Sequence, residues 1–245
     1  MKHLTISFLL FFFILASCKK SVVELERNMP YADSVSFSIN GKNYVCAERN
    51  TSGMANRQIN IKPSDTVITG RRWQYMTGKF YWYGEKDSTL YSISEDFLAD
   101  STYGYTHIDI SFNKKYGNNQ MKRNFFLHPI DSSLIFKKGK QPFAVDLNLE
   151  NTMEGVAIEV HTKEAVGLLS TYIPGFSILI NTKLPRTIQD ESSFEITKLQ
   201  LLENGIYLVE ARFEVNLFDE KGKAYKLKNG FLRFKTNMKR YQTLN

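Results

Sequence analysis

The sequence predicts an all-β chain with a single antiparallel β-sandwich or barrel-like domain. Apolar and polar residues alternate with a period of two through most of it, and turn residues recur about every eight to twelve positions. Aromatic residues make up 13% of the composition, which is enough to fill a core. Helical periodicity is weak: Ser92-Ile93-Ser94-Glu95 has capping-box spacing, but the apolar residues after it support at most two turns. We therefore expect one domain over residues 33–236, with a weak boundary at residues 137–141.

The domain begins with a hairpin signal. Val35, Phe37 and Ile39 alternate with serines, Asn40-Gly41 follows, and residues 43–47 return. Asn-Gly suits a type I′ turn, because both central positions of that turn need positive φ. Cys46 lies in the return strand, where we expect a small buried residue rather than a reactive thiol.

The same alternation predicts the remaining strands. The longest clean run is residues 207–217, which Gly222 turns into a last strand at 225–236, before a C-terminal tail at 237–245. Earlier strands are expected at residues 59–61 (stopped by Pro63), 73–83, 90–93, 108–112, 125–130, 134–136, 145–149, 156–160, 177–182 and 194–202.

The N-terminus reads as an export signal. A basic lead, Met1-Lys2-His3, precedes an apolar run that ends at Leu15 and is too short to remain as a membrane span. Leu15-Ala16-Ser17-Cys18 resembles the bacterial lipobox. The resemblance implies a signal peptide at residues 1–17, cleavage before Cys18, and acylation of Cys18 with chains such as palmitate. An ordinary cleavage site beside a free cysteine is the alternative.

Residues 18–32 are expected to form the lipid anchor and a flexible tether. Surface-displayed Bacteroidota lipoproteins carry an acidic cluster after the lipid, whereas this chain has Lys19-Lys20-Ser21. That departure favours an outer-membrane lipoprotein that faces the periplasm. Because Cys46 is the one other cysteine, no intramolecular disulfide is expected once Cys18 is acylated.

Both ends of the domain carry a wider resemblance. Residues 36–42 (SFSINGK), 211–219 (ARFEVNLFD) and 228–234 (KNGFLRF) resemble the opening hairpin and closing strands of uncharacterised Bacteroidota envelope lipoproteins. The resemblance implies an all-β fold of unknown function and a place in the cell envelope, and it implies no activity.

Catalytic motifs are scarce. His107, His128 and His161 have no zinc-ligand spacing, and we expect no catalytic residue, metal site or cofactor. His107 shares a strand face with Asp109, as His161 does with Glu159, and solvated pairs are the expected outcome. A carboxylate pair for glycan hydrolysis stays open, since its spacing is set in three dimensions.

An aromatic stretch offers a ligand-binding hypothesis. Exposed rings there could stack on sugar or an apolar partner, with arginines nearby as donors. A strand buried on both faces is the alternative. The candidate residues are Trp73, Tyr81, Trp82, Tyr83, Arg71 and Arg72.

The C-terminal strand suggests a basic patch. The chain has a formal net charge of +7, and Lys226, Lys228, Arg233 and Lys235 fall in a segment without acids. The patch would suit anionic glycans, lipid phosphates or an acidic protein; a solvated, aggregation-resistant edge is the alternative. Nucleic acid is not expected as a partner of an envelope protein.

Four Asp-Ser/Thr-x segments resemble the Bacteroidota O-glycosylation pattern. The acceptors would be Ser34, Thr66, Ser88 and Ser101, where glycans would add solubility.

Together these features predict a lipid-anchored, non-enzymatic binding module for a glycan or an envelope protein. Two alternatives remain: a glycan-processing hydrolase, and a structural accessory subunit of an outer-membrane complex.

Overall fold

The structure is a computed structural model. It describes residues 32–49, 62–68, 71–75, 81–84, 88–99, 106–123, 127–149, 152–162, 167–174, 184–202 and 205–237. Residues from Asp33 to Asn245 make one compact unit. Across the described residues the regular structure is β-strand with two 3₁₀ turns and no α-helix, which confirms the all-β prediction.

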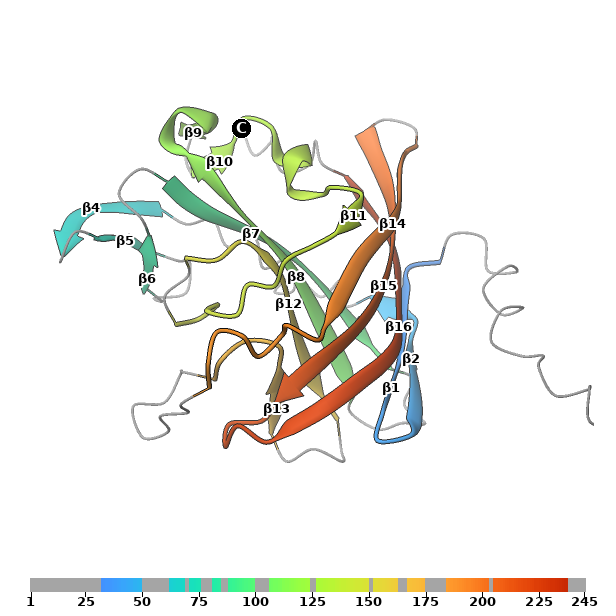
Figure 1. The fold of residues 1–245 in the computed structure, drawn as a ribbon. Helices are drawn as coiled ribbons and strands as arrows, with labels where there is room; N and C mark the ends of the chain where they lie inside the picture. The colour runs from blue at the N-terminus through green and yellow to red at the C-terminus, as the bar shows by residue number, and fades with distance from the viewer. Residues whose placement is uncertain are drawn as a thin grey trace, which may run out of the picture. The chain divides into compact units, whose positions relative to one another are not determined.

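An antiparallel sheet of eleven strands dominates the domain (Figure 1). Its order is β2-β1-β16-β15-β13-β12-β8-β7-β3, with β14 paired to β15 and β11 paired to β14. The strands are β1 (Ser34–Ile39), β2 (Lys42–Cys46), β3 (Glu48–Arg49), β7 (Ser88–Leu98), β8 (His107–Gly117), β11 (Gly139–Lys140), β12 (Gly155–His161), β13 (Leu168–Ser170), β14 (Ser193–Leu201), β15 (Ile206–Phe218) and β16 (Ala224–Asn237).

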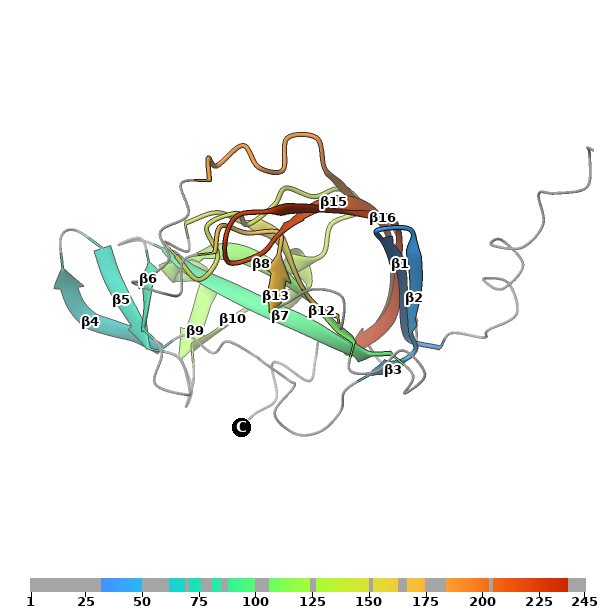
Figure 2. The same cartoon turned by 90° about the horizontal axis from the view of Figure 1, so that it is seen from below.

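The sheet curls until the chain itself links its two ends. β2 and β3 stand at opposite ends of the strand order, yet Ala47 alone separates them in sequence. β2 pairs with β1, while Glu48 and Arg49 of β3 pair with Leu98 and Phe97 of β7. Figure 2 shows the curvature, with β15, β16 and β1 wrapping around one side of the domain. The domain is therefore barrel-like.

The concave face of this sheet holds the main core. Each strand contributes alternate residues, such as Val156, Ile158 and Val160 of β12, which are buried. Aromatic rings fill the centre: the ring of Phe112 lies 4.8 Å from that of Phe136 and 5.9 Å from those of Phe194 and Phe234.

The outer face of β7, β8 and β12 is partly covered as well. A second apolar cluster joins Leu90, Ala144, Leu147, Ala157 and Tyr172. Strands buried on both faces lose their simple alternation, because neighbouring residues of both faces are then covered. This is why β8 is buried almost continuously from Ile108 to Asn113.

Two small sheets and two 3₁₀ turns complete the described structure. β4 (Lys62–Ile68), β5 (Arg71–Tyr75) and β6 (Tyr81–Gly84) form a three-stranded sheet, which lies beside the curled sheet in both views (Figures 1 and 2). β9 (Met121–Arg123) pairs with β10 (Leu127–Pro129). The turns are η3 (Asn118–Gln120) and η4 (Ser132–Ile135).

The predicted opening hairpin and closing strands are confirmed. Asn40 and Gly41 have φ values of 52° and 78°, the sign that a type I′ turn requires. β14, β15 and β16 match the predicted strands within two residues at each end, and Gly222 adopts a φ of 79° in the turn between β15 and β16.

Several local predictions were wrong. Pro63, which was expected to stop a strand, lies inside β4, whereas the strand expected at residues 90–93 lies within β7. The run 73–83 contains two strands, β5 and β6, which pair with each other. Residues 145–149 form turns, and 134–136 overlap η4 rather than a strand. The predicted strands at 59–61 and 177–182 lie outside the described residues.

Candidate functional site

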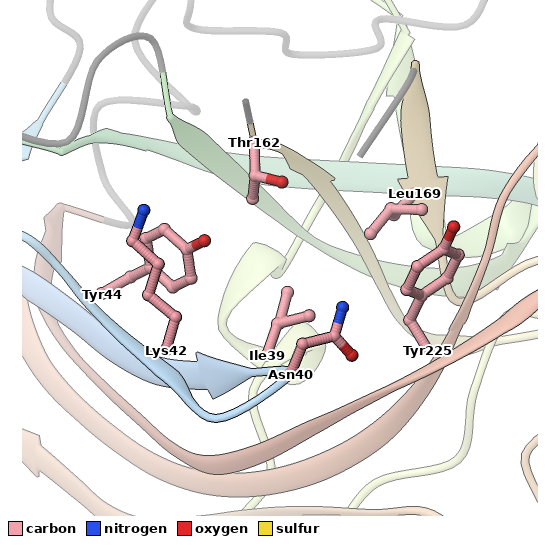
Figure 3. Close-up of a pocket in the computed structure, with 7 residues that line it drawn as sticks. All are labelled: Ile39, Asn40, Lys42, Tyr44, Thr162, Leu169 and Tyr225. Carbon is pink, nitrogen blue, oxygen red and sulfur yellow. The ribbon is translucent and has the colours of Figure 1, made fainter. Parts of the chain in front are cut away.

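A pocket opens at the end of the curled sheet where the β1–β2 turn lies. It has a volume of about 230 Å³ and is drawn in Figure 3. Its lining comes from five separate parts of the fold: Ile39 and Asn40 at the end of β1, Lys42 and Tyr44 of β2, Thr162 after β12, Leu169 of β13, and Tyr225 of β16.

The tight Asn-Gly turn sets the register that builds one wall of the pocket. Ile39 pairs with Lys42, and Phe37 pairs with Tyr44. Phe37 and Tyr44 stack with ring centroids 5.2 Å apart, which fixes the Tyr44 ring against the core. In Figure 3 the side chain of Ile39 points into the space between Tyr44 on one side and Leu169 and Tyr225 on the other.

Each tyrosine of the pocket carries a lysine over its ring. The Lys42 ammonium lies 5.3 Å from the Tyr44 centroid, and the Lys223 ammonium lies 4.9 Å from the Tyr225 centroid. These distances are within the range of cation–π attraction. The Tyr225 hydroxyl lies 3.5 Å from Oδ2 of Asp219, whose other oxygen accepts hydrogen bonds from the backbone of Lys221 and Lys223.

The lining suits recognition of a small ligand. Rings and aliphatic side chains supply apolar area, while the Asn40 amide, the Thr162 hydroxyl and the Lys42 ammonium supply polar groups. The described residues that line this pocket directly include no carboxylate, imidazole or thiol.

A second polar cluster lies on the outer face of four neighbouring strands. Asp109 of β8 is directly paired with Asp96 of β7 and with Glu159 of β12, and Glu159 is paired with Ser170 of β13. The next row pairs His107 with His161. The two imidazole rings stack with centroids 4.4 Å apart, and Nδ1 of His107 lies 2.9 Å from Oδ1 of Asp96.

This carboxylate–histidine row is largely enclosed. Asp109 is only 8% exposed. The Tyr172 hydroxyl donates to Oε1 of Glu159 at 2.6 Å and accepts from the Asn148 amide at 3.1 Å. Burial, followed by the charge of Glu159, raises the pKa of Tyr172 well above its usual range. Tyr172 therefore serves as a neutral hydrogen-bond donor that holds the Glu159 carboxylate in place.

The cluster partly overturns the expectation of solvated histidine–carboxylate pairs. Sequence periodicity placed His107 with Asp109 and His161 with Glu159, but the side-chain hydrogen bond of His107 is with Asp96 of the neighbouring strand. The side chains of His107 and Asp96 are 16% and 14% exposed, so this pair is mostly shielded from solvent. No group of three or more His, Cys, Asp or Glu residues in the described parts of the chain is arranged to hold a metal ion.

The predicted aromatic site lies on the three-stranded sheet. The backbone register pairs Trp73 with Tyr83 and Tyr75 with Tyr81, which makes four aromatic residues cross-strand neighbours. Trp82 pairs with Gln74. Arg71 and Arg72 pair with Ile68 and Val67 of β4. The side chains of this sheet lie outside the described residues, so its binding role stays a prediction.

The predicted basic patch is more mixed in charge than its sequence indicates. Arg233 donates through Nε to Oε1 of Glu210 at 2.9 Å, and both side chains are mostly covered. Arg212 and Arg233 lie 5.5 Å and 5.3 Å from the Phe231 ring centroid. Lys228 is exposed, whereas Lys226 and Lys235 are half-buried. One acidic residue of β15, Glu210, therefore neutralises part of the basic strand.

The predicted glycosylation acceptors and the two cysteines are only partly within the described residues. Ser34 and Ser88 are the half-buried first residues of β1 and β7, Thr66 lies in β4, and Cys18 and Ser101 are outside the described residues. Cys46 is fully buried, and burial together with the charge of Asp96 raises its thiol pKa to about 12. The prediction that Cys46 is buried is confirmed, and its low reactivity stays a prediction.

Comparisons with protein-family models, curated proteins and solved structures found no match to this chain. Among the described residues, no helix is long and apolar enough to cross a membrane.

The pocket was missed by sequence reasoning. Its residues extend from Ile39 to Tyr225, and only the Asn40-Gly41 turn carried a local signal. That signal predicted the hairpin but could not indicate which strands lie opposite it.

Proposed function

We propose that this protein is a lipid-anchored binding module of a bacterial cell envelope, and that the pocket between Tyr44 and Tyr225 takes up one unit of a glycan. The anchor is Cys18, as the lipobox resemblance implies, and the favoured location is the outer membrane on its periplasmic side. The observation that carries the binding function is the pocket lining: two tyrosines, an amide, a hydroxyl and an ammonium around an apolar floor.

A sugar ring has the complementary chemistry. Its C–H face packs on aromatic and aliphatic side chains, and its hydroxyls need donors and acceptors in fixed positions. The Asn40 and Thr162 side chains offer such groups from opposite sides of the pocket (Figure 3). Lys42 adds a positive charge at the rim, which favours a sugar with a carboxylate or other anionic substituent.

Binding would be tested with the mature chain on an array of neutral and uronic-acid-containing oligosaccharides, followed by calorimetry on those that bind. Tyr225→Leu should abolish or strongly weaken binding of every ligand. Lys42→Gln should weaken binding of acidic ligands by about tenfold or more while sparing neutral ones, because a hydrogen bond to a charged group is worth about 1.5–3 kcal/mol.

Lys228→Gln is the matched control. Lys228 is an exposed lysine of β16 that does not line the pocket, so this variant should bind like the wild-type chain. Equal losses for Lys42→Gln and Lys228→Gln would show that general charge, not the pocket, governs binding. Absence of any bound oligosaccharide would refute the glycan proposal.

One observation favours glycan hydrolysis as a second candidate. Asp109 and Glu159 are direct cross-strand neighbours, so two carboxyl groups lie on one face of the sheet. Retaining glycosidases also use a pair of carboxyl groups, about 5–5.5 Å apart. New reducing ends released from a bound oligosaccharide, and their loss in Asp109→Asn at an oligosaccharide concentration that saturates the variant, would support this candidate. A bound but uncleaved ligand would exclude it.

A further inference from the structure

We propose that the turn between β10 and η4, together with the lysines around it, is a docking surface for anionic lipid headgroups. The surface consists of Ile130 and Leu134 with Lys122, Lys137, Lys138 and Lys140. The proposal goes beyond the glycan pocket and does not depend on it.

Two large apolar side chains are exposed at this turn. Ile130 is 58% exposed and Leu134 is 49% exposed. They are only four positions apart, so a single short segment presents both. Amphipathic segments that lie in a membrane interface combine such apolar side chains with basic neighbours.

The backbone of the turn holds these side chains outward. The Ile130 amide donates to the Gln120 carbonyl at 2.9 Å. Asp131 caps η4, since its Oδ1 accepts from the Ser133 amide at 2.9 Å and from the Ser133 hydroxyl at 2.6 Å. Hydrogen bonds therefore hold the turn both to Gln120, which precedes β9, and to the Asp131 cap of η4.

The core below is already occupied by the next two residues. Ile135 and Phe136 are buried, and the Phe136 ring packs against Phe112 and Phe234. Leu134 cannot move inward without displacing them, because a packed core has no spare volume. Its exposure is a fixed property of this turn.

Basic side chains outnumber acidic ones on the segment that carries the two apolar side chains, and β14 places one acidic residue, Glu195, opposite Lys140. Lys122, Lys137, Lys138 and Lys140 are all exposed. Between residues 118 and 142 the sole acidic residue is Asp131, and its carboxylate is engaged in the cap of η4. Each lysine near an anionic bilayer strengthens binding by about fivefold, so this set is complementary to anionic headgroups.

The fold also separates this surface from the pocket. Figure 1 shows β9, β10 and β11 at one end of the curled sheet and the β1–β2 turn at the other. A domain that rests on lipid through Ile130 and Leu134 would keep the pocket turned toward the aqueous side. Contact with the bilayer and uptake of a soluble glycan are then compatible.

The test uses the full chain, purified from membranes and reconstituted into vesicles. Leu134→Cys is labelled with an environment-sensitive fluorophore, and Val45→Cys is the control, because Val45 is 48% exposed on β2, outside the proposed surface. Cys46 is buried with a raised thiol pKa and Cys18 is the acylation site, so the introduced thiol should react selectively. One set of vesicles contains phosphatidylcholine alone, and the other contains phosphatidylcholine with about one-third phosphatidylglycerol.

In vesicles with phosphatidylglycerol, the probe at residue 134 should gain fluorescence several-fold and be quenched by nitroxide-labelled lipid, while the probe at residue 45 should not change. Changing Lys137, Lys138 and Lys140 together to Gln should return the residue 134 signal to its level in phosphatidylcholine. Equal signals at residues 134 and 45, or at residue 134 in both vesicle types, would overturn the proposal.

Flotation of the chain is recorded with the phosphatidylcholine vesicles, to which the docking surface should not bind, and therefore reports the lipid anchor separately. A chain that floats while its Leu134 probe is silent in the vesicles with phosphatidylglycerol refutes the docking surface and leaves the anchor intact. A probe that responds in a chain without acyl groups supports the docking surface and refutes the anchor.

Discussion

Gly230 of β16 is a position where one methyl group should measurably destabilise the domain. Gly230 is directly paired with Phe213 of β15. A Cβ atom built on Gly230 would lie 2.5 Å from Cδ2 and 2.6 Å from Cε2 and Cγ of the Phe213 ring. Carbon atoms pack at about 3.5–4.0 Å, so the ring and the strand would have to separate by roughly 1 Å.

The ring has little freedom to make that movement. Phe213 is 2% exposed, and its ring stacks on Phe194 with centroids 5.4 Å apart and planes at 21°. Overpacking in such sites costs about 1–3 kcal/mol, and we expect Gly230→Ala to fall near 3 kcal/mol. For a domain of this size that corresponds to a fall in Tm of roughly 6–12 °C.

A double-mutant cycle separates the clash from other effects of the alanine. Phe213→Ala removes the three ring atoms that the new methyl group meets, so the double variant should be more stable than the sum of the two single costs predicts, by about 1–2 kcal/mol. Urea unfolding followed by circular dichroism gives all four stabilities. Additivity within about 0.5 kcal/mol would refute the steric explanation.

Three further predictions concern positions along the same sheet. Gly155 has a φ of +128°, and a Cβ atom built there would clash with the Pro142 carbonyl oxygen. Gly41 has a φ of +78°, and a Cβ atom built there has no neighbour within 4 Å. Gly155→Ala should therefore destabilise the domain by at least about 2 kcal/mol more than Gly41→Ala does. Equal urea midpoints would contradict this. Burial raises the pKa of the Cys46 thiol from 9.0 to about 12, so between these pH values the folded state keeps a proton that the unfolded state loses. The free energy of unfolding of the wild-type chain should therefore fall by about 1.4 kcal/mol per pH unit in this range, relative to that of Cys46→Ala. Parallel curves of unfolding free energy against pH for the two chains would exclude this contribution. Tyr172→Phe removes the 2.6 Å hydrogen bond to Glu159 and should lower the free energy of unfolding by about 1–3 kcal/mol. Tyr207→Phe, at a half-buried tyrosine of β15, should lower it by less. Equal urea unfolding curves for the two variants would contradict this difference.

Alternation predicted the strands where one face is core and the other meets solvent. Residues 207–217 and 225–236 follow that rule, and their strands were correctly placed. Val145 and Leu147 alternate with polar residues just as clearly, but here hydrogen bonds from side chains to the backbone replace the strand-to-strand hydrogen bonds of a sheet. The Asp146 carboxylate accepts hydrogen bonds from the amides of Thr152 and Met153, and Asn148 adopts a φ of 65°, so residues 145–149 turn.

Long-range pairing outweighs the weak helix signal at residues 92–95, next to the strand predicted at 90–93. The Ser-x-x-Glu spacing there is a local helix signal worth about 1 kcal/mol, whereas β7 pairs with β8 along eleven residues from Ser88 to Leu98. A local signal cannot report such a partner. The same limit applies to the functional residues: periodicity grouped His107 with Asp109 and Glu159 with His161, but only the register of β8 against β12 brings these pairs together.

The register of these strands also connects the two polar regions of the domain. Thr162, which lines the pocket, directly follows His161 of the carboxylate–histidine row, and Leu169, which also lines the pocket, is paired with Val160. The end of β12 therefore serves both sites, with its polar residues on the outer face and Thr162 at the pocket. A change in the outer row that shifts β12 along β8 would move Thr162 relative to Tyr44 and Tyr225, since a strand transmits displacement along its length. If the pocket binds a glycan as proposed, Asp109→Asn should alter its affinity without touching the ligand, and an unchanged affinity would show that the two sites are independent.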